Sequence, residues 1–336
     1  MASPGLYDEE HDAFRVTVRG WIDKHVRPHA ERWDAEGIVD RELFTSAARD
    51  GVLGFSVPEE YGGGGVDDFR FNAVMAEEVG RSAVSSGTGC VALSNDIVIP
   101  YFTSLTDTVQ RKRWLPGIAS GEQVVAVAMT EPGTGSDLSG IRTRAVRDGD
   151  HFVVNGAKTF ISNGQNADLV ATAVRTGDHP HKGLSLLVIE RGMPGFERGR
   201  NLEKIGLHAQ DTSELSFADV RVPVENLLGQ EGEGFAGLMR NLPQERLAIA
   251  LGSTAAAEGT FQRTLDYVKE RTAFGQPIGS FQNTRFVMAE MHTELAVTRA
   301  YMDECLHKHV TGELGPEDAA AAKWWATELQ VRVVNR

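Results

Sequence analysis

The spacing of apolar residues changes twice along this 336-residue chain, and these changes constrain the fold more than any other feature. Residues 1–122 show a helical period, residues 123–231 consist of short runs rich in Val, Ile, Phe and Thr, and residues 232–336 are helical again. The middle zone lacks the strand–helix alternation of a parallel nucleotide-binding sheet. The sequence therefore predicts an α+β fold, mostly α, with an N-terminal helical domain, a middle antiparallel β domain and a C-terminal helical bundle.

Local signals place elements within these zones. Phe14, Val18 and Trp21 form an apolar stripe on a first helical segment that we expect to end near Pro28. The Asp-Gly pair in RDGDH, residues 147–151, predicts a hairpin turn. One long helix is predicted near the C-terminus by an apolar series at helical spacing: Met288, Met291, Leu295, Met302 and Leu306.

Composition limits the possible classes of function. The net charge of −13 argues against sequence-independent binding of nucleic acid, because neutralising phosphates requires clustered Lys and Arg. Cys90 and Cys305 are the only cysteines and lie far apart, so neither a disulfide framework nor a metal site is indicated. We expect a cytoplasmic protein without stable membrane insertion, since the N-terminus lacks the basic residues of a targeting peptide and no apolar run is long enough. The last helical pattern is unbroken at Arg336, which suggests that a natural C-terminal segment is missing.

The stretch VAMTEPGTGSD, residues 127–137, is compatible with a phosphate-binding loop, a flavin-binding loop or an ordinary turn. It contains neither G-x-G-x-x-G nor a closing Gly-Lys-Ser/Thr, and a strand-like segment follows it, so both common nucleotide motifs are excluded. The stretch KTFISNG, residues 158–164, has a similar character. Taken alone, each motif is more typical of a strand end than of a binding site.

Taken in order, AMTEPGTGSD, KTFISNG and ERTAFGQPIGSFQ make the chain resemble the acyl-CoA dehydrogenase family, and LPQERL most resembles its long-chain type. The resemblance extends over essentially the whole chain. It implies that the three domains hold FAD at their junction and that the protein is a homotetramer. It also implies dehydrogenation of a saturated acyl-CoA to a trans-2-enoyl-CoA, with a hydride taken by flavin N5 and electrons passed to an electron-transfer flavoprotein.

The resemblance further implies which residues of the β zone contact the cofactor. These candidates are Met129, Thr130, Gly135, Ser136, Phe160, Ile161 and Ser162. Thr130 would address the polar edge of the flavin ring, and Ser136 would border both the pyrophosphate and the pantetheine arm of the substrate. Phe160 would replace the tryptophan often found against the flavin. Glu131 is interpreted as structural.

The segment ERTAFGQPIGSFQ resembles the family's segment that reaches the FAD of a neighbouring subunit. Its candidate cofactor contacts are Arg271, Thr272, Phe274 and Gln282. A guanidinium suits this role, because it binds phosphate with two parallel hydrogen bonds and stays charged. Taken alone, the segment would be interpreted as a solvated basic turn.

Removing an α-proton from a thioester requires a positioned carboxylate. In the long-chain and isovaleryl branches of the family this glutamate lies on the helix after the β domain, which implies Glu245 as the catalytic base. The local sequence alone favours another interpretation, in which Glu245 follows Pro243 in the first turn of a helix, where the dipole favours an acid. Arg246 is a candidate substrate contact, although its different helix face favours a structural role.

Two alternatives stay open. The same fold serves acyl-CoA oxidases and flavin-dependent hydroxylases, although Glu245 counts against a hydroxylase. The chain could also be a catalytically inactive helical scaffold. The acyl length is not fixed by the sequence, since the apolar segment CVALSNDIVIPYF, expected to line the acyl pocket, suits linear or branched chains.

Overall fold

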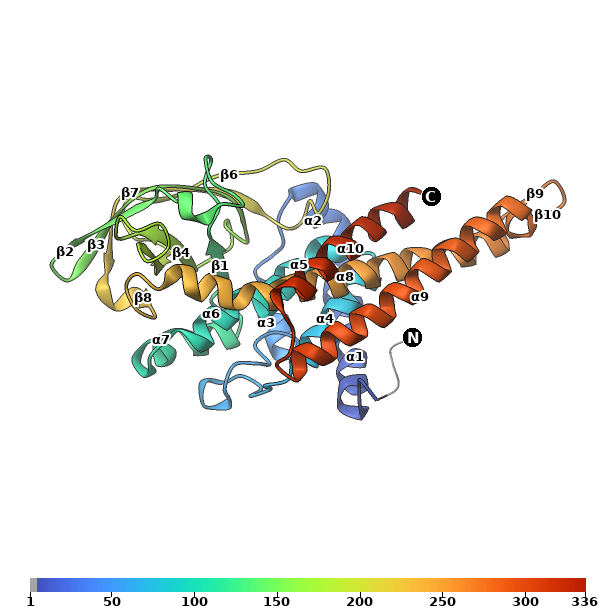
Figure 1. Ribbon diagram of the computed structural model, residues 1–336, viewed down its shortest axis with the longest axis horizontal. Coiled ribbons are helices and arrows are strands. Elements are labelled where there is room, and N and C mark those ends of the chain that lie inside the picture. The colour runs from blue at the N-terminus through green and yellow to red at the C-terminus, as the bar shows by residue number, and fades with distance from the viewer. Residues whose placement is uncertain (1–4) are drawn as a thin grey trace. The chain divides into compact units, whose positions relative to one another are not determined.

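The computed structural model of the protein describes residues 5–336, without the side chain of Ser85, and has most of its strands in the middle zone (Figure 1). The α-helices are α1 (Glu9–Trp21), α2 (Ala30–Glu36), α3 (Glu42–Arg49), α4 (Phe69–Arg81), α5 (Ser85–Leu93), α6 (Ile99–Ser104), α7 (Thr108–Ala119), α8 (Gly234–Glu270), α9 (Gln282–Val310) and α10 (Pro316–Asn335). The strands are β1 (Val125–Ala128), β2 (Arg144–Asp148), β3 (His151–Ser162), β4 (Leu169–Arg175), β5 (Leu184–Glu190), β6 (Phe196–Asn201), β7 (Thr212–Pro223), β8 (Leu227–Leu228), β9 (Thr272–Ala273) and β10 (Gln276–Pro277). The predicted α+β fold, mostly α, is confirmed.

The chain forms two compact units. The helical unit comprises the segment up to Ile22, Asp68–Ser85 and Leu242–Arg336, so it contains α1, α4, most of α8, α9 and α10. The sheet unit comprises Asp23–Asp67 and Ser86–Asn241. Helices of the N-terminal zone are therefore divided between the two units. The domain boundaries expected from the sequence stay predictions.

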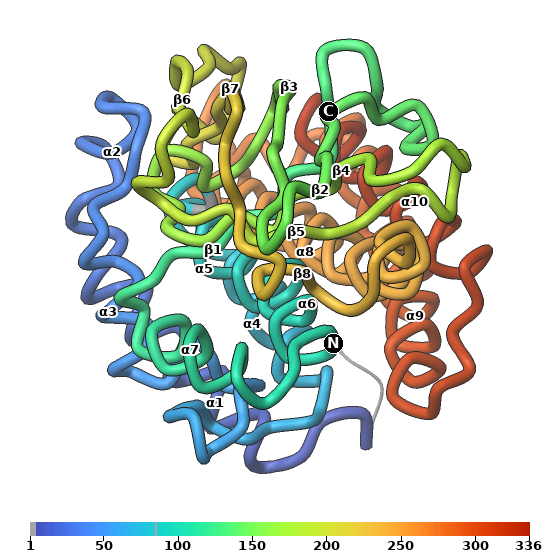
Figure 2. Tube along the Cα trace, turned by 90° about the vertical axis from the view of Figure 1, so that its left-hand side faces the viewer, coloured from blue at the N-terminus to red at the C-terminus, as the bar shows by residue number. Residues whose placement is uncertain are grey.

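The sheet unit contains an eight-stranded sheet with the order β6-β7-β3-β2-β4-β5-β8, and β1 pairs with β4. Figure 2 shows β6, β7 and β3 side by side in this order. Neighbouring strands are antiparallel as predicted, except that β1 is parallel to β4 and that β2 meets β4 in one parallel pair, Arg144 with Arg175. The β1–β4 pair is parallel because the chain returns through β2 and β3 before it enters β4.

Alternating side chains of β3 and β7 supply much of the buried core beneath this sheet. Phe152 pairs with Val222 and Val154 pairs with Val220, and all four side chains are buried. The turn between β2 and β3 contains Gly149 at a φ of 62°, a conformation that glycine adopts without steric strain. The hairpin predicted from RDGDH is therefore confirmed.

The helical unit is built on α8 and α9, two long helices joined by the short β9–β10 hairpin, with α10 packed on α9 (Figure 1). The five apolar side chains that predicted a long helix lie on α9 and are all buried. A Cβ atom on Gly80 would lie 2.4 Å from the carbonyl oxygen of Gly252, so α4 and α8 approach too closely there for a larger residue. Across residues 5–336, every helix is too short or too polar to span a bilayer.

The first helix ends earlier than the sequence suggests. Helix α1 stops at Trp21, and the chain continues through a π-helical turn, Ile22–Val26, and a 3-10 turn, Arg27–His29, before α2 begins. Pro28 lies inside the 3-10 turn, where its fixed φ and its missing N–H group are tolerated. The end near Pro28 predicted for the first helical segment was therefore placed too late.

Candidate functional site

The turn that follows β1 is built around one buried acid. Glu131 is 7% exposed, and its carboxylate accepts hydrogen bonds from the backbone amides of Arg142 (2.7 Å) and Thr143 (2.9 Å). Main-chain hydrogen bonds in both directions also join Glu131 to Thr134. These contacts fix the shape of the turn and agree with the interpretation of Glu131 as structural.

Strand β3 holds this turn through a second buried charge. The Lys158 ammonium donates to a carboxylate oxygen of Glu131 and to the carbonyl oxygen of Met129, both at 2.9 Å. Next along β3, the Thr159 amide donates to the carbonyl oxygen of Thr130 at 2.9 Å. Burial lowers the pKa of Lys158 to about 8, and the Glu131 carboxylate offsets part of this shift. The structure therefore brings together VAMTEPGTGSD and KTFISNG, the two motifs that lie apart in the sequence.

A bulge in β3 exposes the side chain of Phe160 and buries that of Ile161. The register against β7 shifts between Lys158 and Ile161, and Phe160 has a φ of 59°, which is uncommon for a bulky residue. The Phe160 side chain is 66% exposed, whereas Ile161 is 2% exposed and belongs to the core of the sheet unit. Ile161 could therefore contact a ligand only through its backbone, while Phe160 offers an aromatic face. Such strain is common at ligand sites.

The surface of the turn fits a cofactor of the flavin type. A Cβ atom added to Gly133 or Gly135 would meet no atom within 4 Å, so a ligand can approach the backbone there. Ser136 is exposed, and Thr130 and Ser162 are half-buried. Within the part of the chain that the structure describes, these three hydroxyls donate no hydrogen bond to the protein. The turn thus combines open backbone with available hydroxyl donors, which suits the polar edge and phosphates of FAD.

Glu245 lies in the interior of α8 in the helical unit and is 7% exposed. Pro243 also lies inside this helix, which begins at Gly234. The interpretation of Glu245 as an acid in a first helical turn is therefore wrong, because the N–H groups that create the positive end of the dipole lie more than two turns away. Arg246, the other candidate on this segment, is half-buried.

The four candidate residues of the segment ERTAFGQPIGSFQ lie around the β9–β10 hairpin, and all are exposed: Arg271, Thr272, Phe274 and Gln282. Phe274 is 95% exposed and has a φ of 52°. At a rise of 1.5 Å per residue, the stretch of α8 from Glu245 to Glu270 places the hairpin about 37 Å from Glu245. Glu245 and the hairpin of one chain therefore cannot contact the same small ligand group.

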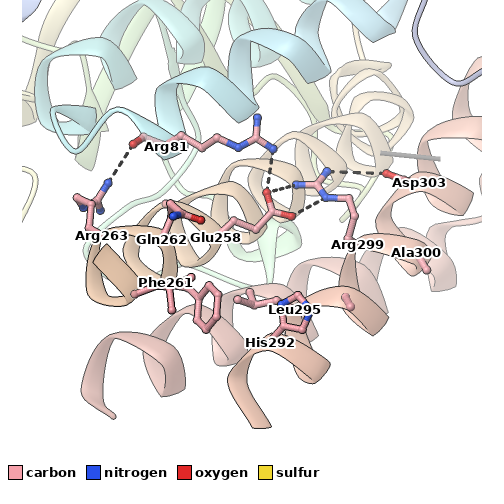
Figure 3. A pocket seen from close by; sticks show the side chains of 13 residues that line it. Arg81, Glu258, Phe261, Gln262, Arg263, His292, Leu295, Arg299, Ala300 and Asp303 are labelled. Atoms are coloured by element: carbon pink, nitrogen blue, oxygen red, sulfur yellow. Dashed lines mark hydrogen bonds and ion pairs between the residues drawn. The ribbon is translucent and has the colours of Figure 1, made fainter. Parts of the chain in front are cut away.

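The helical unit also contains a groove of about 990 Å³ between α8 and α9, shown in Figure 3. Its wall includes an ionic cluster around the buried Arg299, which donates to Glu258 (2.8 and 2.9 Å), and Arg81 donates to the same carboxylate (2.8 Å). None of the candidate residues from the sequence lines this groove. Across residues 5–336, no group of three or more His, Cys, Asp and Glu side chains is arranged to hold a metal ion.

The Lys158–Glu131 pair was missed in the sequence. One signal points to it: alternation along β3 places Phe152, Val154 and Lys158 at even positions, and all three are buried. A lysine on the inward face of a strand needs a buried partner. The sequence does not show which acid provides it.

Comparisons with known proteins agree on one family. Family models described as the N-terminal, middle and C-terminal domains of acyl-CoA dehydrogenase match residues 8–122, 126–220 and 232–336. The mitochondrial long-chain specific acyl-CoA dehydrogenase of Sus scrofa is 43% identical over 97% of this chain and 76% of the relative. An acyl-CoA dehydrogenase structure from Geobacillus kaustophilus has a TM-score of 0.95 and 46% identity, covering 100% of this chain and 88% of its own. A glutaryl-CoA dehydrogenase from Mycobacterium smegmatis in complex with FADH2 has a TM-score of 0.90 and 27% identity, covering 98% of this chain and 83% of its own.

Proposed function

The chain belongs to the acyl-CoA dehydrogenase family of FAD-dependent oxidoreductases, and we propose that it converts a saturated acyl-CoA to the trans-2-enoyl-CoA with Glu245 as the base. One observation carries the assignment of the base. Glu245 is a buried carboxylate in the interior of α8, more than two turns from its N-terminus, so the helix dipole does not account for an acid at this position. Its neighbours in LPQERL resemble those of the long-chain type.

The proposal assigns each candidate residue one role in binding or catalysis. The Glu245 carboxylate takes the α-proton of the thioester. Thr130 and Ser162 donate hydrogen bonds to the cofactor, and Phe160 forms an apolar wall beside its ring. Ser136 borders the pyrophosphate and the pantetheine arm. When bound, FAD supplies the acceptor for the hydride from the β-carbon.

Steady-state turnover tests the role of Glu245. We expect Glu245→Gln to lower kcat by about 10²- to 10⁴-fold, since an amide cannot accept the α-proton. The matched control is Glu231→Gln, which removes an exposed acid just before α8. Loss of activity in both variants, or in neither, would contradict the assignment. A ladder of acyl-CoA lengths should begin with long chains, because the Sus scrofa relative is named as long-chain specific.

The proposal includes assembly into a homotetramer. The distance of about 37 Å along α8 supports a hairpin that acts on the FAD of another subunit. Large apolar side chains are exposed near the hairpin, on Tyr267, Phe274 and Phe286. Sedimentation of the FAD-bound protein tests this assembly, and a monomer would contradict it.

Two further parts of the proposal concern the physiological setting. An electron-transfer flavoprotein is proposed as the electron acceptor, which is typical of the family, and its reduction during turnover is the test. Peroxide formed in its place would indicate an oxidase. A cytoplasmic location stays a prediction from the sequence.

A further inference from the structure

Lys158 is a buried cation that no step of the proposed reaction uses. It is 1% exposed in β3, and its ammonium donates to the carbonyl oxygen of Met129 and to Glu131, both at 2.9 Å. Glu131 does not depend on this bond for its hydrogen bonding, because the amides of Arg142 and Thr143 already occupy its two oxygens. The lysine therefore does more than satisfy a buried acid.

The bond to Met129 acts on the group next to the cofactor. The carbonyl of Met129 and the N–H of Thr130 belong to the same peptide unit. A positive charge on the carbonyl oxygen polarises this unit and strengthens its N–H as a hydrogen-bond donor, an effect that low dielectric surroundings enhance. The next carbonyl, that of Thr130, is fixed by the amide of Thr159. Both peptide units that flank Thr130 are therefore held by β3.

We propose that Lys158 is a positioning residue for FAD, which orients the Met129–Thr130 peptide and strengthens the Thr130 N–H as a donor to the polar edge of the flavin. The inference rests on the proposed cofactor role of Thr130. Reduction of a flavin by two electrons adds negative charge to its ring, so a stronger donor stabilises the reduced form more than the oxidised form. Lys158 thereby raises the reduction potential of the bound flavin.

The surroundings of Lys158 support a role beyond stability. Burial lowers its pKa to about 8, so the site disfavours the charge that it holds. Such poorly compensated charges are common at functional sites. Lys158 also stands at the edge of the strained bulge at Phe160, whose exposed ring is proposed to face the cofactor.

The reduction potential of the FAD-bound protein, measured without substrate, tests the inference. Lys158→Met should lower the equilibrium ratio of reduced to oxidised flavin at least tenfold, which equals about 30 mV for a two-electron couple. The matched control is Lys204→Met, because Lys204 also donates to a backbone carbonyl of the sheet unit, that of Gln210. The ratio of reduced to oxidised flavin should stay unchanged in Lys204→Met.

The outcomes separate this inference from the proposed reaction. A ratio that changes less than threefold in an FAD-bound Lys158→Met protein would overturn the role of Lys158 and leave Glu245 as the base. An equal fall in the ratio of reduced to oxidised flavin in Lys204→Met would also overturn the role of Lys158 and leave Glu245 as the base. If Lys158→Met does not fold, the variant Lys158→Met/Glu131→Gln removes both charges and should show the same fall in the ratio. Loss of turnover in Glu245→Gln does not affect this measurement, since no substrate is present.

Discussion

The two units of the molecule each bury a cation, and they hold it in different ways. In the sheet unit, Lys158 meets one carboxylate, that of Glu131, at 2.9 Å. In the helical unit, Arg299 is 4% exposed and donates to Glu77 at 2.7 Å. It also donates to Glu258 at 2.8 and 2.9 Å and lies 3.8 Å from the Asp303 carboxylate (Figure 3). One cation thus has a single acidic partner and the other has three.

The pKa values of the two cations move in opposite directions. Burial lowers the pKa of Lys158 to about 8, and Glu131 offsets only part of the shift. Burial also acts to lower the pKa of Arg299, but Glu77 and Glu258 outweigh it and the pKa is raised. The charge of Arg299 is therefore compensated and links three helices, α4, α8 and α9. The charge of Lys158 is under-compensated and is directed at a backbone carbonyl, that of Met129, in the turn that follows β1.

The largest effect is expected from removing the compensated cation. Arg299→Met removes this partner from the buried Glu77 and the half-buried Glu258, so we expect a loss of about 3–5 kcal/mol in the free energy of unfolding. Urea denaturation measures it. The control is Arg336→Met, because Arg336 forms a half-buried pair with Glu294 at 2.9 Å and should contribute about 0–1 kcal/mol. Equal losses in the two variants would contradict the stabilising role of the Arg299 cluster.

A smaller effect is expected in the pH dependence of stability. Lys158 titrates near pH 8 in the folded protein but near 10.5 when unfolded, so the unfolded chain holds more protons between these values. The free energy of unfolding should therefore rise with pH across this window by up to about 1.4 kcal/mol per unit relative to Lys158→Met. Glu131 is the charged group that faces this ammonium. Parallel pH profiles in the two proteins would show that Lys158 is not under-compensated.

The smallest effect concerns the strained bulge beside Lys158. Phe160→Gly relieves a positive φ and loses little burial, so the free energy of unfolding should rise by up to about 1 kcal/mol. The affinity for FAD should fall, because the aromatic wall is lost. The control is Leu207→Gly, which also removes a half-exposed apolar residue at positive φ, 51°, from the sheet unit. Leu207→Gly should raise stability without weakening FAD binding. Equal FAD affinities in the two variants would contradict the role of Phe160 as an aromatic wall beside the cofactor.

The architecture was largely predictable, because it depends on the spacing of apolar residues within short stretches of the sequence. Apolar spacing predicted the buried face of α9, and turn chemistry predicted the β2–β3 hairpin around Gly149. Strand β6 carries no such signal, since FERGRN is a charged edge strand whose side chains are mostly not buried. The parallel pairing of β1 with β4 depends on the path of the chain, which local patterns do not contain.

The site was predictable only in part. The resemblance named the candidate residues of the turn that follows β1. Pro243, however, suggested a helix start where α8 continues, and buried side chains on both sides of the proline, Leu238 and Leu247, favour the continued helix. The link between Glu131 and Lys158 was not predictable, since 27 residues separate them and the contact depends on the fold around β3. Charge compensation is likewise a property of neighbours brought together by folding.

The most direct test of the proposed reaction is anaerobic mixing of the FAD-bound protein with a saturated long-chain acyl-CoA. The flavin absorbance should bleach in a single turnover, and Glu245→Gln should prevent the bleaching while its FAD stays bound. Bleaching of Glu245→Gln at the rate of the unmodified protein would contradict the assignment of Glu245 as the base.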